Sequence, residues 1–175
     1  MEILNMKKLL LLILITLSTT ILAKTPDSLF GVYINDNVLD YVTKEELKSK
    51  YRYKARGFYG LRLKNPPVSN KDYSDKLFIK FDKNNKIGEI KSQKNFQNFE
   101  TCEKVEYEVR RQLETKYEIK FVRNSRTKYG FYKWVGDNVI ATQCRVFSDD
   151  KITLFITLDT EKYQEKYTEH FDSKI

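Results

Sequence analysis

Histidine, cysteine, proline and glycine are scarce in this sequence of 175 residues, which contains one, two, three and six of them, respectively. Catalytic triads and most metal sites need histidine as a base or a ligand, and His170 is the single one present. No CxxC or HxxxH spacing occurs, so no metal and no cofactor are expected. The few prolines and glycines also leave no material for a flexible linker, which favours one domain.

Candidate catalytic groups are limited to acidic pairs, since the sequence contains neither a glycine-rich phosphate loop nor a calcium-loop pattern. Asp36 with Asp40, and Asp149 with Asp150, are the two pairs that would suit a hydrolase working with two carboxylates. The first pair also fits the start of a helix, and the second fits the chemistry of a turn. The sequence therefore predicts that the protein is not an enzyme, with a carboxylate-based hydrolase as the weaker alternative.

Long apolar runs are lacking as well, and the one short run lies near the beginning of the chain. Leu9–Leu22 follows two lysines and precedes Ala23, which is the order of a secretory signal peptide. The run is shorter than the roughly 20 apolar residues that a membrane-spanning helix needs, although a retained anchor is the alternative. We therefore expect a signal peptide at 1–23 and a single exported domain, periplasmic or secreted, at 24–175.

Apolar and polar residues alternate with a period of two in several later segments, which indicates strands. KLFIKF and KIGEIKSQ flank the turn sequence DKNN and predict a hairpin. The other expected strands are Leu29–Ile34, Lys128–Val135, Asn138–Phe147 and Lys151–Asp159. One long helix should begin after Asn98, which can cap it. The predicted fold is α+β: an antiparallel sheet, made of a hairpin plus a three-stranded meander, with the helix packed on one face and a short C-terminal helix.

The long helix carries an apolar stripe that includes one of the two cysteines. The stripe comprises Phe99, Cys102, Val105, Val109, Leu113 and Tyr117, whereas Glu106, Arg110, Glu114 and Glu118 are expected on the surface. Cys144 shares a face of its strand with Ile140 and Val146, so both thiols should point into the core. Because disulfides persist in an oxidising compartment, we expect a Cys102–Cys144 disulfide, with two buried free cysteines as the alternative.

Four short motifs are spread over the chain that follows the leader. They are an FG-plus-aliphatic opening (Phe30, Gly31, Val32), a K-I-x-x-I strand from Lys86 to Ile90, a cysteine-bearing helix ending in Lys116–Tyr117, and a late strand with Gln143–Cys144. Together they resemble a loose group of small exported bacterial proteins of uncharacterised function. The resemblance implies a signal, a disulfide and a single domain, and it implies no activity and no site residue.

A basic ladder follows a short helix for which Thr43 and Glu46 supply a capping box. In KSKYRYKARGFYG, cations occupy every second position, which is the period of a strand with its cations on one face. The candidate binding residues are Lys48, Lys50, Arg52, Lys54 and Arg56. An edge strand that carries cations to prevent pairing with another molecule explains the alternation without a ligand, and we favour that interpretation.

Positive charge exceeds negative charge over the whole chain, which has a formal net charge of +8. Arg62 and Lys64 extend the ladder, and no acidic residue lies between Lys48 and Lys64. A second basic and aromatic cluster comprises Arg123, Arg126, Lys128, Tyr129, Phe131, Tyr132, Lys133 and Trp134. Such clusters suit single-stranded nucleic acid. Export argues against that partner and favours an anionic envelope surface, an acidic glycan or an acidic protein.

The sequence therefore predicts a small, basic, exported protein that acts as a non-catalytic binding or interaction module toward an anionic partner. A structural or accessory protein with no dedicated ligand is the alternative, in which the charge serves solubility alone. Binding that weakens steeply with salt would favour the first prediction over the second.

Overall fold

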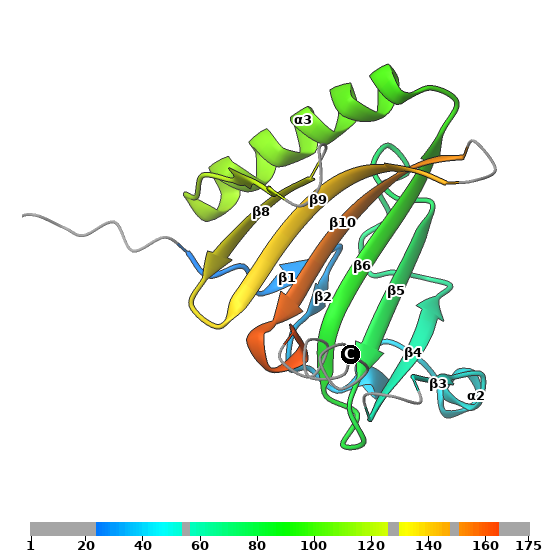
Figure 1. The fold of residues 1–175 in the computed structure, drawn as a ribbon. Coiled ribbons are helices and arrows are strands. Elements are labelled where there is room, and N and C mark those ends of the chain that lie inside the picture. Colours follow the sequence, from blue (N-terminus) through cyan, green and yellow to red (C-terminus); the bar gives the residue numbers. More distant parts are fainter. Residues whose placement is uncertain (1–23, 54–56, 126–129, 148–150, 165–175) are drawn as a thin grey trace, which may run out of the picture.

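The computed structural model describes residues 24–53, 57–125, 130–147 and 151–164, which form an α+β fold (Figure 1). The strands are β1 (Ser28–Leu29), β2 (Val32–Tyr33), β3 (Tyr51–Tyr53), β4 (Phe58–Leu63), β5 (Lys76–Phe81), β6 (Ile87–Phe96), β7 (Val122–Arg123), β8 (Gly130–Val135), β9 (Asn138–Val146) and β10 (Ile152–Thr160). The helices are the 3-10 helix η1 (Val38–Asp40), α2 (Lys44–Lys48) and α3 (Phe99–Tyr117).

Eight of the described strands form one antiparallel sheet in the order β3-β4-β5-β6-β10-β9-β8-β7. The expected hairpin is β5–β6, in which Ile79 lies opposite Ile90, and the expected meander is β8–β9–β10. β10 also pairs with β6, with Ile156 opposite Ser92, so the hairpin and the meander belong to one sheet. The predicted fold class is confirmed, although the sheet is larger than the two predicted motifs.

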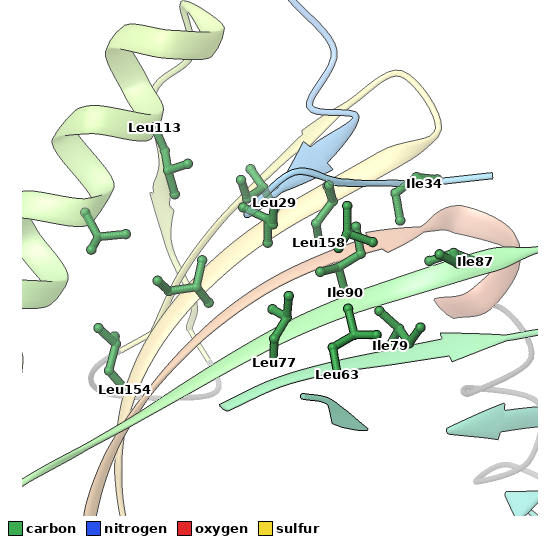
Figure 2. Packing of buried hydrophobic residues seen from close by; sticks show 14 of the residues in the cluster. Leu29, Ile34, Leu63, Leu77, Ile79, Ile87, Ile90, Leu113, Leu154 and Leu158 are labelled. Carbon is green, nitrogen blue, oxygen red and sulfur yellow. The ribbon is translucent and has the colours of Figure 1, made fainter. Parts of the chain in front are cut away.

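α3 and the β1–β2 hairpin lie on the same face of the sheet and enclose the main core with it (Figure 2). The alternation of β5 turns Leu77, Ile79 and Phe81 into this core, where all three are buried. Figure 2 shows Leu113 of α3 and Leu29 of β1 on the same side of the sheet as Leu77 and Ile79. The helix and the hairpin therefore share the covering of one sheet face.

α3 begins at the expected cap, because the Asn98 side chain accepts a hydrogen bond from the Thr101 N–H over 2.8 Å. The prediction that Glu106 lies on the surface is wrong, since this side chain is buried against β9. Glu106 Oε1 accepts hydrogen bonds from Thr142 Oγ1 (2.5 Å) and from Arg110 Nε (3.2 Å). These bonds replace the water that a buried carboxylate loses.

The predicted disulfide is present and joins Cys102 of α3 to Cys144 of β9. Val146, which was expected in the core with Cys144, is the last residue of β9 and is 52% exposed. At the other end of α3, the Tyr117 hydroxyl donates a hydrogen bond to the Ser28 carbonyl over 2.8 Å. The helix is thus fastened to the sheet near its start and to β1 near its end.

The strand expected at Leu29–Ile34 is instead a tight hairpin, with Leu29 of β1 opposite Val32 of β2. Its two-residue turn consists of Phe30 and Gly31, whose φ angles are 53° and 76°. Positive φ at both central residues is the requirement of a type I′ turn, which twists in the same sense as the strands it joins. The FG dipeptide was therefore a turn signal inside an apolar run.

Residues 161–164 are helical, at the start of the segment for which a C-terminal helix is expected, and Tyr163 is buried. The remaining residues of that segment and the leader at 1–23 lie outside the described residues. Within the described ranges, no helix is both long enough and apolar enough to cross a membrane.

Candidate functional site

The basic ladder predicted as a binding site is divided between a helix, a connection and a strand. Lys48 is the last residue of α2, and its Nζ forms an exposed ion pair with Glu45 Oε1 over 2.8 Å. Lys50 follows α2, and its Nζ lies 4.3 Å from the centre of the Tyr59 ring. These two cations therefore already have partners within the protein and belong to no common strand face.

The strand part of the ladder lies at the margin of the sheet. β3 is the first strand in the sheet order, and it places Arg52 opposite Tyr59 of β4. Lys54 and Arg56 lie outside the described residues. An edge position is what the ligand-free interpretation of the ladder requires. The role of the ladder as a binding site stays a prediction.

A cavity of about 430 Å³ lies where β4 ends and β5 begins, beside the loop 64–75 that connects them. Small-molecule sites typically have volumes of about 300–1,000 Å³. Five cations line it: Arg62, Lys64, Lys71, Lys76 and Lys94. Asp75 is the one acidic residue among its described lining residues. We call this site the cationic cavity.

Most of the positive charge in the cationic cavity is not neutralised by neighbouring carboxylates. Among the described residues, only Lys94 of the five cations is in an ion pair, since its Nζ lies 3.8 Å from Asp75 Oδ1. The Asp75 carboxylate is further occupied by the Asn95 N–H, which donates to Oδ2 over 3.1 Å. Like charges around a concave surface raise the local potential and attract an ion of opposite charge. The cationic cavity is therefore suited to an anion.

Loop 64–75 is held in place by hydrogen bonds from the β1–β2 turn, from β6 and from α3. The bonds are Val68 N–H to the Phe30 carbonyl (3.1 Å), Ser92 Oγ to the Tyr73 carbonyl (3.3 Å), Lys94 Nζ to the Lys71 carbonyl, and Gln112 Nε2 to Tyr73 Oη (2.8 Å). Pro66 and Pro67 further restrict the backbone of the loop. A preformed cavity loses less conformational entropy on binding, which favours affinity.

Phe30 lines the cationic cavity from the β1–β2 turn. A residue with a Cβ atom in the left-handed region costs about 1–3 kcal/mol, and such residues concentrate at functional sites. Gly31 brings the turn close to the loop, because a Cβ atom at this position would lie 2.9 Å from Pro67 Cβ. The strained phenylalanine is therefore placed where the turn meets the wall of the cavity.

A second cavity, of about 300 Å³, lies between α3, the β1–β2 turn and loop 64–75, and we call it the helix-side cavity. Its buried apolar walls are Leu29, Val109, Leu113 and Ile156. It shares Phe30, Val68 and Asn70 with the cationic cavity. The two cavities are thus neighbours that differ in chemistry.

A larger hollow of about 580 Å³ runs along the outer side of α3 near its C-terminal end. Its lining carries both signs of charge, with Arg110, Arg111 and Lys120 beside Glu114 and Glu118. Lys120 Nζ lies 3.5 Å from Glu114 Oε2, so part of this charge is paired internally. The hollow therefore lacks the excess of one sign that distinguishes the cationic cavity.

A group of buried charged residues lies on the sheet face opposite α3, and we call it the buried ion cluster. Lys80 Nζ lies 2.5 Å from Glu89 Oε2, and Asp159 of β10 is directly opposite Glu89. Gln164 Nε2 donates to Asp159 Oδ2 over 2.5 Å. Burial, together with the negative charge of Glu89, raises the pKa of Asp159 well above 3.8. Folding therefore favours the protonated form of Asp159 relative to the unfolded chain.

The buried ion cluster is better explained as part of the fold than as an active site. Adjacent carboxylates can serve a hydrolase, but Glu89 and Asp159 are only 4% and 6% exposed. Lys80 Nζ also lies 4.9 Å from the centre of the Tyr163 ring. A substrate would have to displace an ion pair and the helical residues 161–164 to reach the carboxylates.

The first carboxylate pair predicted from the sequence is also engaged in local structure. Asp36 Oδ2 accepts a hydrogen bond from the Tyr41 hydroxyl. Burial and this hydrogen bond raise the pKa of Tyr41 to about 12. Asp40 lies in η1, which follows directly. Asp36 thus holds the end of η1 to the chain before it, whereas Asn37 caps the start of η1 by accepting a hydrogen bond from the Leu39 N–H over 3.0 Å.

Several other sequence predictions lie outside the described residues. The second carboxylate pair, Asp149 and Asp150, and the single histidine, His170, are among them. Within the ranges that the structure describes, no group of three or more potential metal ligands is found.

The sequence identified part of the cationic cavity but not the cavity itself. Arg62 and Lys64 belong to the acid-free segment, whereas Lys71, Lys76 and Lys94 lie in a loop and in two other strands. Their spacing follows no period, because the fold gathers them from separate segments. The signals that could have indicated the cavity are the loop sequence NPPV between cations and the FG turn that packs against it.

No protein-family model matches this chain, and no curated protein or solved structure matches it. The resemblance to small exported bacterial proteins therefore stays an expectation. The function has to be argued from the geometry and charge of the described residues.

Proposed function

We propose that the protein is a non-catalytic binding protein that receives an anionic ligand in the cationic cavity. The observation that carries this proposal is the gathering of five cations and a single carboxylate around one concave surface. Lysine and arginine bind phosphate and carboxylate groups through charge-assisted hydrogen bonds. An anionic envelope surface, an acidic glycan and an acidic protein all present such groups. Export, which the leader predicts, is part of the same proposal.

The cationic cavity is favoured over the basic ladder because its five described cations line one concave surface. Lys76 and Lys94 are half-buried, whereas the other three cations of the cavity are exposed, as are Lys48 and Lys50 of the ladder. Exposed charges are screened by water and salt and bind weakly one at a time. A concave wall lets several cations contact the same anion, which the edge strand β3 does not offer.

Titration of the protein with inorganic phosphate, followed by amide chemical shifts in NMR, tests this proposal. We expect shifts centred on loop 64–75 and the start of β5, with binding that weakens between low salt and about 0.1 M salt, where the screening length is about 10 Å. Arg62→Gln/Lys64→Gln/Lys76→Gln should remove this binding, because it neutralises three of the converging cations while leaving Lys94 to hold the loop.

A matched control separates the cationic cavity from overall charge. Lys83→Gln/Lys86→Gln/Lys104→Gln removes the same number of positive charges, all three exposed and outside the described lining of the cavity, and should leave phosphate binding unchanged. Lys48→Gln/Lys50→Gln tests the ladder in the same way. Equal binding by the first triple variant and the native protein would overturn the proposal and favour a structural or accessory protein with no dedicated ligand.

A further inference from the structure

We propose that the cationic cavity and the helix-side cavity together hold one small amphipathic anion, with its charged group among the cations and its apolar chain beneath α3. This inference rests on the proposed function, since the anionic group occupies the same cationic cavity. It adds a second part of the site and defines the class of ligand as a phosphate or carboxylate that carries an apolar chain.

The two cavities are placed so that one molecule can occupy both. Phe30, Val68 and Asn70 belong to the walls of each, so the two cavities adjoin at these residues. Val68 is 52% exposed there, although most of the large aliphatic residues that the structure describes are buried. Its N–H is bonded to the Phe30 carbonyl, so the two apolar side chains are held at the junction. A chain passing from one cavity to the other would contact both of them.

The helix-side cavity offers the apolar chain a wall that water cannot hydrogen-bond. Leu29, Val109, Leu113 and Ile156 form that wall, and removing the apolar surface of a ligand from water stabilises its complex. Two polar side chains of the lining already bond each other, because Gln112 Nε2 donates to Tyr73 Oη over 2.8 Å. The apolar wall therefore favours a ligand with an apolar chain.

The distribution of charge between the two cavities decides which end of the ligand lies in which cavity. The cationic cavity contains five cations, whereas Lys116 is the one charged residue in the described lining of the helix-side cavity. An anion with charges at both ends would leave one of them against the apolar wall at a high desolvation cost. A single charged end with an apolar chain is complementary to both cavities at once.

Four probes at concentrations below micelle formation test the inference in NMR titrations: octyl phosphate, octanoate, inorganic phosphate and octyl glucoside. We expect octyl phosphate to bind at least about tenfold more tightly than inorganic phosphate or octyl glucoside, a difference of about 1.4 kcal/mol. Its shifts should extend from loop 64–75 to Val109 and Leu113 of α3. Octanoate shows whether a carboxylate can replace the phosphate: binding at the same residues extends the ligand class to carboxylates, and no binding overturns the carboxylate half of the inference.

Two variants that fill the helix-side cavity locate the apolar chain. Val109→Phe places a larger ring inside it, and Lys116→Trp covers it from the exposed side of α3 in case the internal change prevents folding. Neither residue lines the cationic cavity or holds loop 64–75, so both variants should abolish the advantage of octyl phosphate over inorganic phosphate while leaving inorganic phosphate bound. An unchanged advantage in Lys116→Trp and in folded Val109→Phe would overturn the inference.

The failure of this inference differs from the failure of the proposed function. Equal affinity for octyl phosphate and inorganic phosphate, both lost in Arg62→Gln/Lys64→Gln/Lys76→Gln, would overturn the amphipathic ligand and retain the anion site. Binding of octyl phosphate that survives this triple variant would overturn both, because the charged group would then lie elsewhere.

Discussion

Lys76 and Lys80 lie four residues apart on β5, so their side chains leave the same face of the strand, yet the two ends of the strand use them differently. Lys80 lies opposite Glu89, and the two form a buried ion pair. Lys76 lies opposite Gln93, a neutral residue, and lines the cationic cavity. The comparison teaches that the residue on the partner strand decides whether a cation is held in a buried ion pair or lies at a cavity without a carboxylate opposite it.

Removing the disulfide that fastens α3 should cause the largest loss of stability. α3 forms one wall of the helix-side cavity and lies on the sheet face opposite the buried ion cluster. Cys102→Ala/Cys144→Ala removes a cross-link between residues 42 positions apart. We expect the free energy of unfolding in urea to fall by about 4 kcal/mol, because the unfolded chain gains entropy. The native protein with reduced thiols should behave like this variant, and a loss below about 1 kcal/mol would contradict the expectation.

The next largest loss of stability should come from the Lys80 end of β5, and the same kind of substitution at the Lys76 end should cause almost none. Glu89→Gln leaves the Lys80 ammonium buried without its carboxylate, and we expect a loss of about 3 kcal/mol in the free energy of unfolding. Lys76→Gln, on the same strand and the same face, should change stability by no more than about 0.5 kcal/mol. Phosphate binding should show the opposite order, since only Lys76 lines the cationic cavity.

A double replacement checks the cause of that loss. Lys80→Met/Glu89→Leu removes both charges together and should recover most of the stability that Glu89→Gln loses, because neither member of this ion pair is left buried without the other. Equal stability losses in Glu89→Gln and Lys76→Gln would show that the two ends of β5 do not differ in this way.

A smaller change in stability should depend on pH, because Asp159 in the buried ion cluster binds a proton with a raised pKa. Burial and the charge of Glu89 raise its pKa above 3.8, whereas Lys80 and Lys91 act in the opposite direction. The folded state therefore binds this proton more tightly than the unfolded state. The stability that it contributes is complete below pH 3.8 and is lost as the pH rises through the folded-state pKa.

Asp159→Asn removes this titration and keeps a side-chain oxygen for Gln164. Urea unfolding of both proteins between pH 4 and pH 8 measures the result. We expect the variant to gain stability relative to the native protein as the pH rises, whereas a difference that is constant with pH would refute the raised pKa.

The smallest change in stability is expected at the turn beside the cationic cavity. Phe30→Asn places a residue that accepts positive φ in the type I′ turn, and this gain should offset much of the packing lost with the half-buried ring. We expect a net change within about 1 kcal/mol in thermal unfolding, together with weaker binding of octyl phosphate.

Phe58 provides the control for that substitution at the opposite end of the sheet. It is buried, and its ring centre lies 4.7 Å from that of Tyr163. Phe58→Ala should therefore cost about 3–5 kcal/mol, as for other buried aromatic residues, and leave octyl phosphate binding unaltered. A comparable stability loss in Phe30→Asn would indicate that Phe30 serves packing alone.

Much of the fold could be predicted because its elements have local signals. The alternation around Leu77 and Ile79 indicated the hairpin, and the cap at Asn98 indicated where α3 begins. The phases of Cys102 and Cys144 indicated that they face each other, and the disulfide is confirmed. The hairpin at Phe30–Gly31 was missed because an apolar run with one glycine also fits a strand.

The candidate site was accessible from the sequence only in part. The acid-free segment that includes Arg62 and Lys64 indicated excess positive charge, and it drew attention to the ladder before them. Glu106 was expected in water because helical spacing places it beside the stripe, and its hydrogen bonds to Thr142 on β9 and to Arg110 on α3 explain how it can be buried. For the cations of the cavity as for Glu106, the environment of the side chain depends on residues of other strands and loops, which the local sequence does not show.

The sequence by itself determined which segments become strands and helices and which faces turn inward, since period, caps and turn residues act over a few neighbouring positions. Only the tertiary structure decided which charged side chains become neighbours in the cationic cavity and in the buried ion cluster. β5 and β6 pair in a register that sets Lys80 against Glu89 and Lys76 against Gln93, and loop 64–75 folds back toward the strand ends. Such neighbours are far apart in the chain, so their meeting depends on the pairing of the whole sheet and on no local pattern.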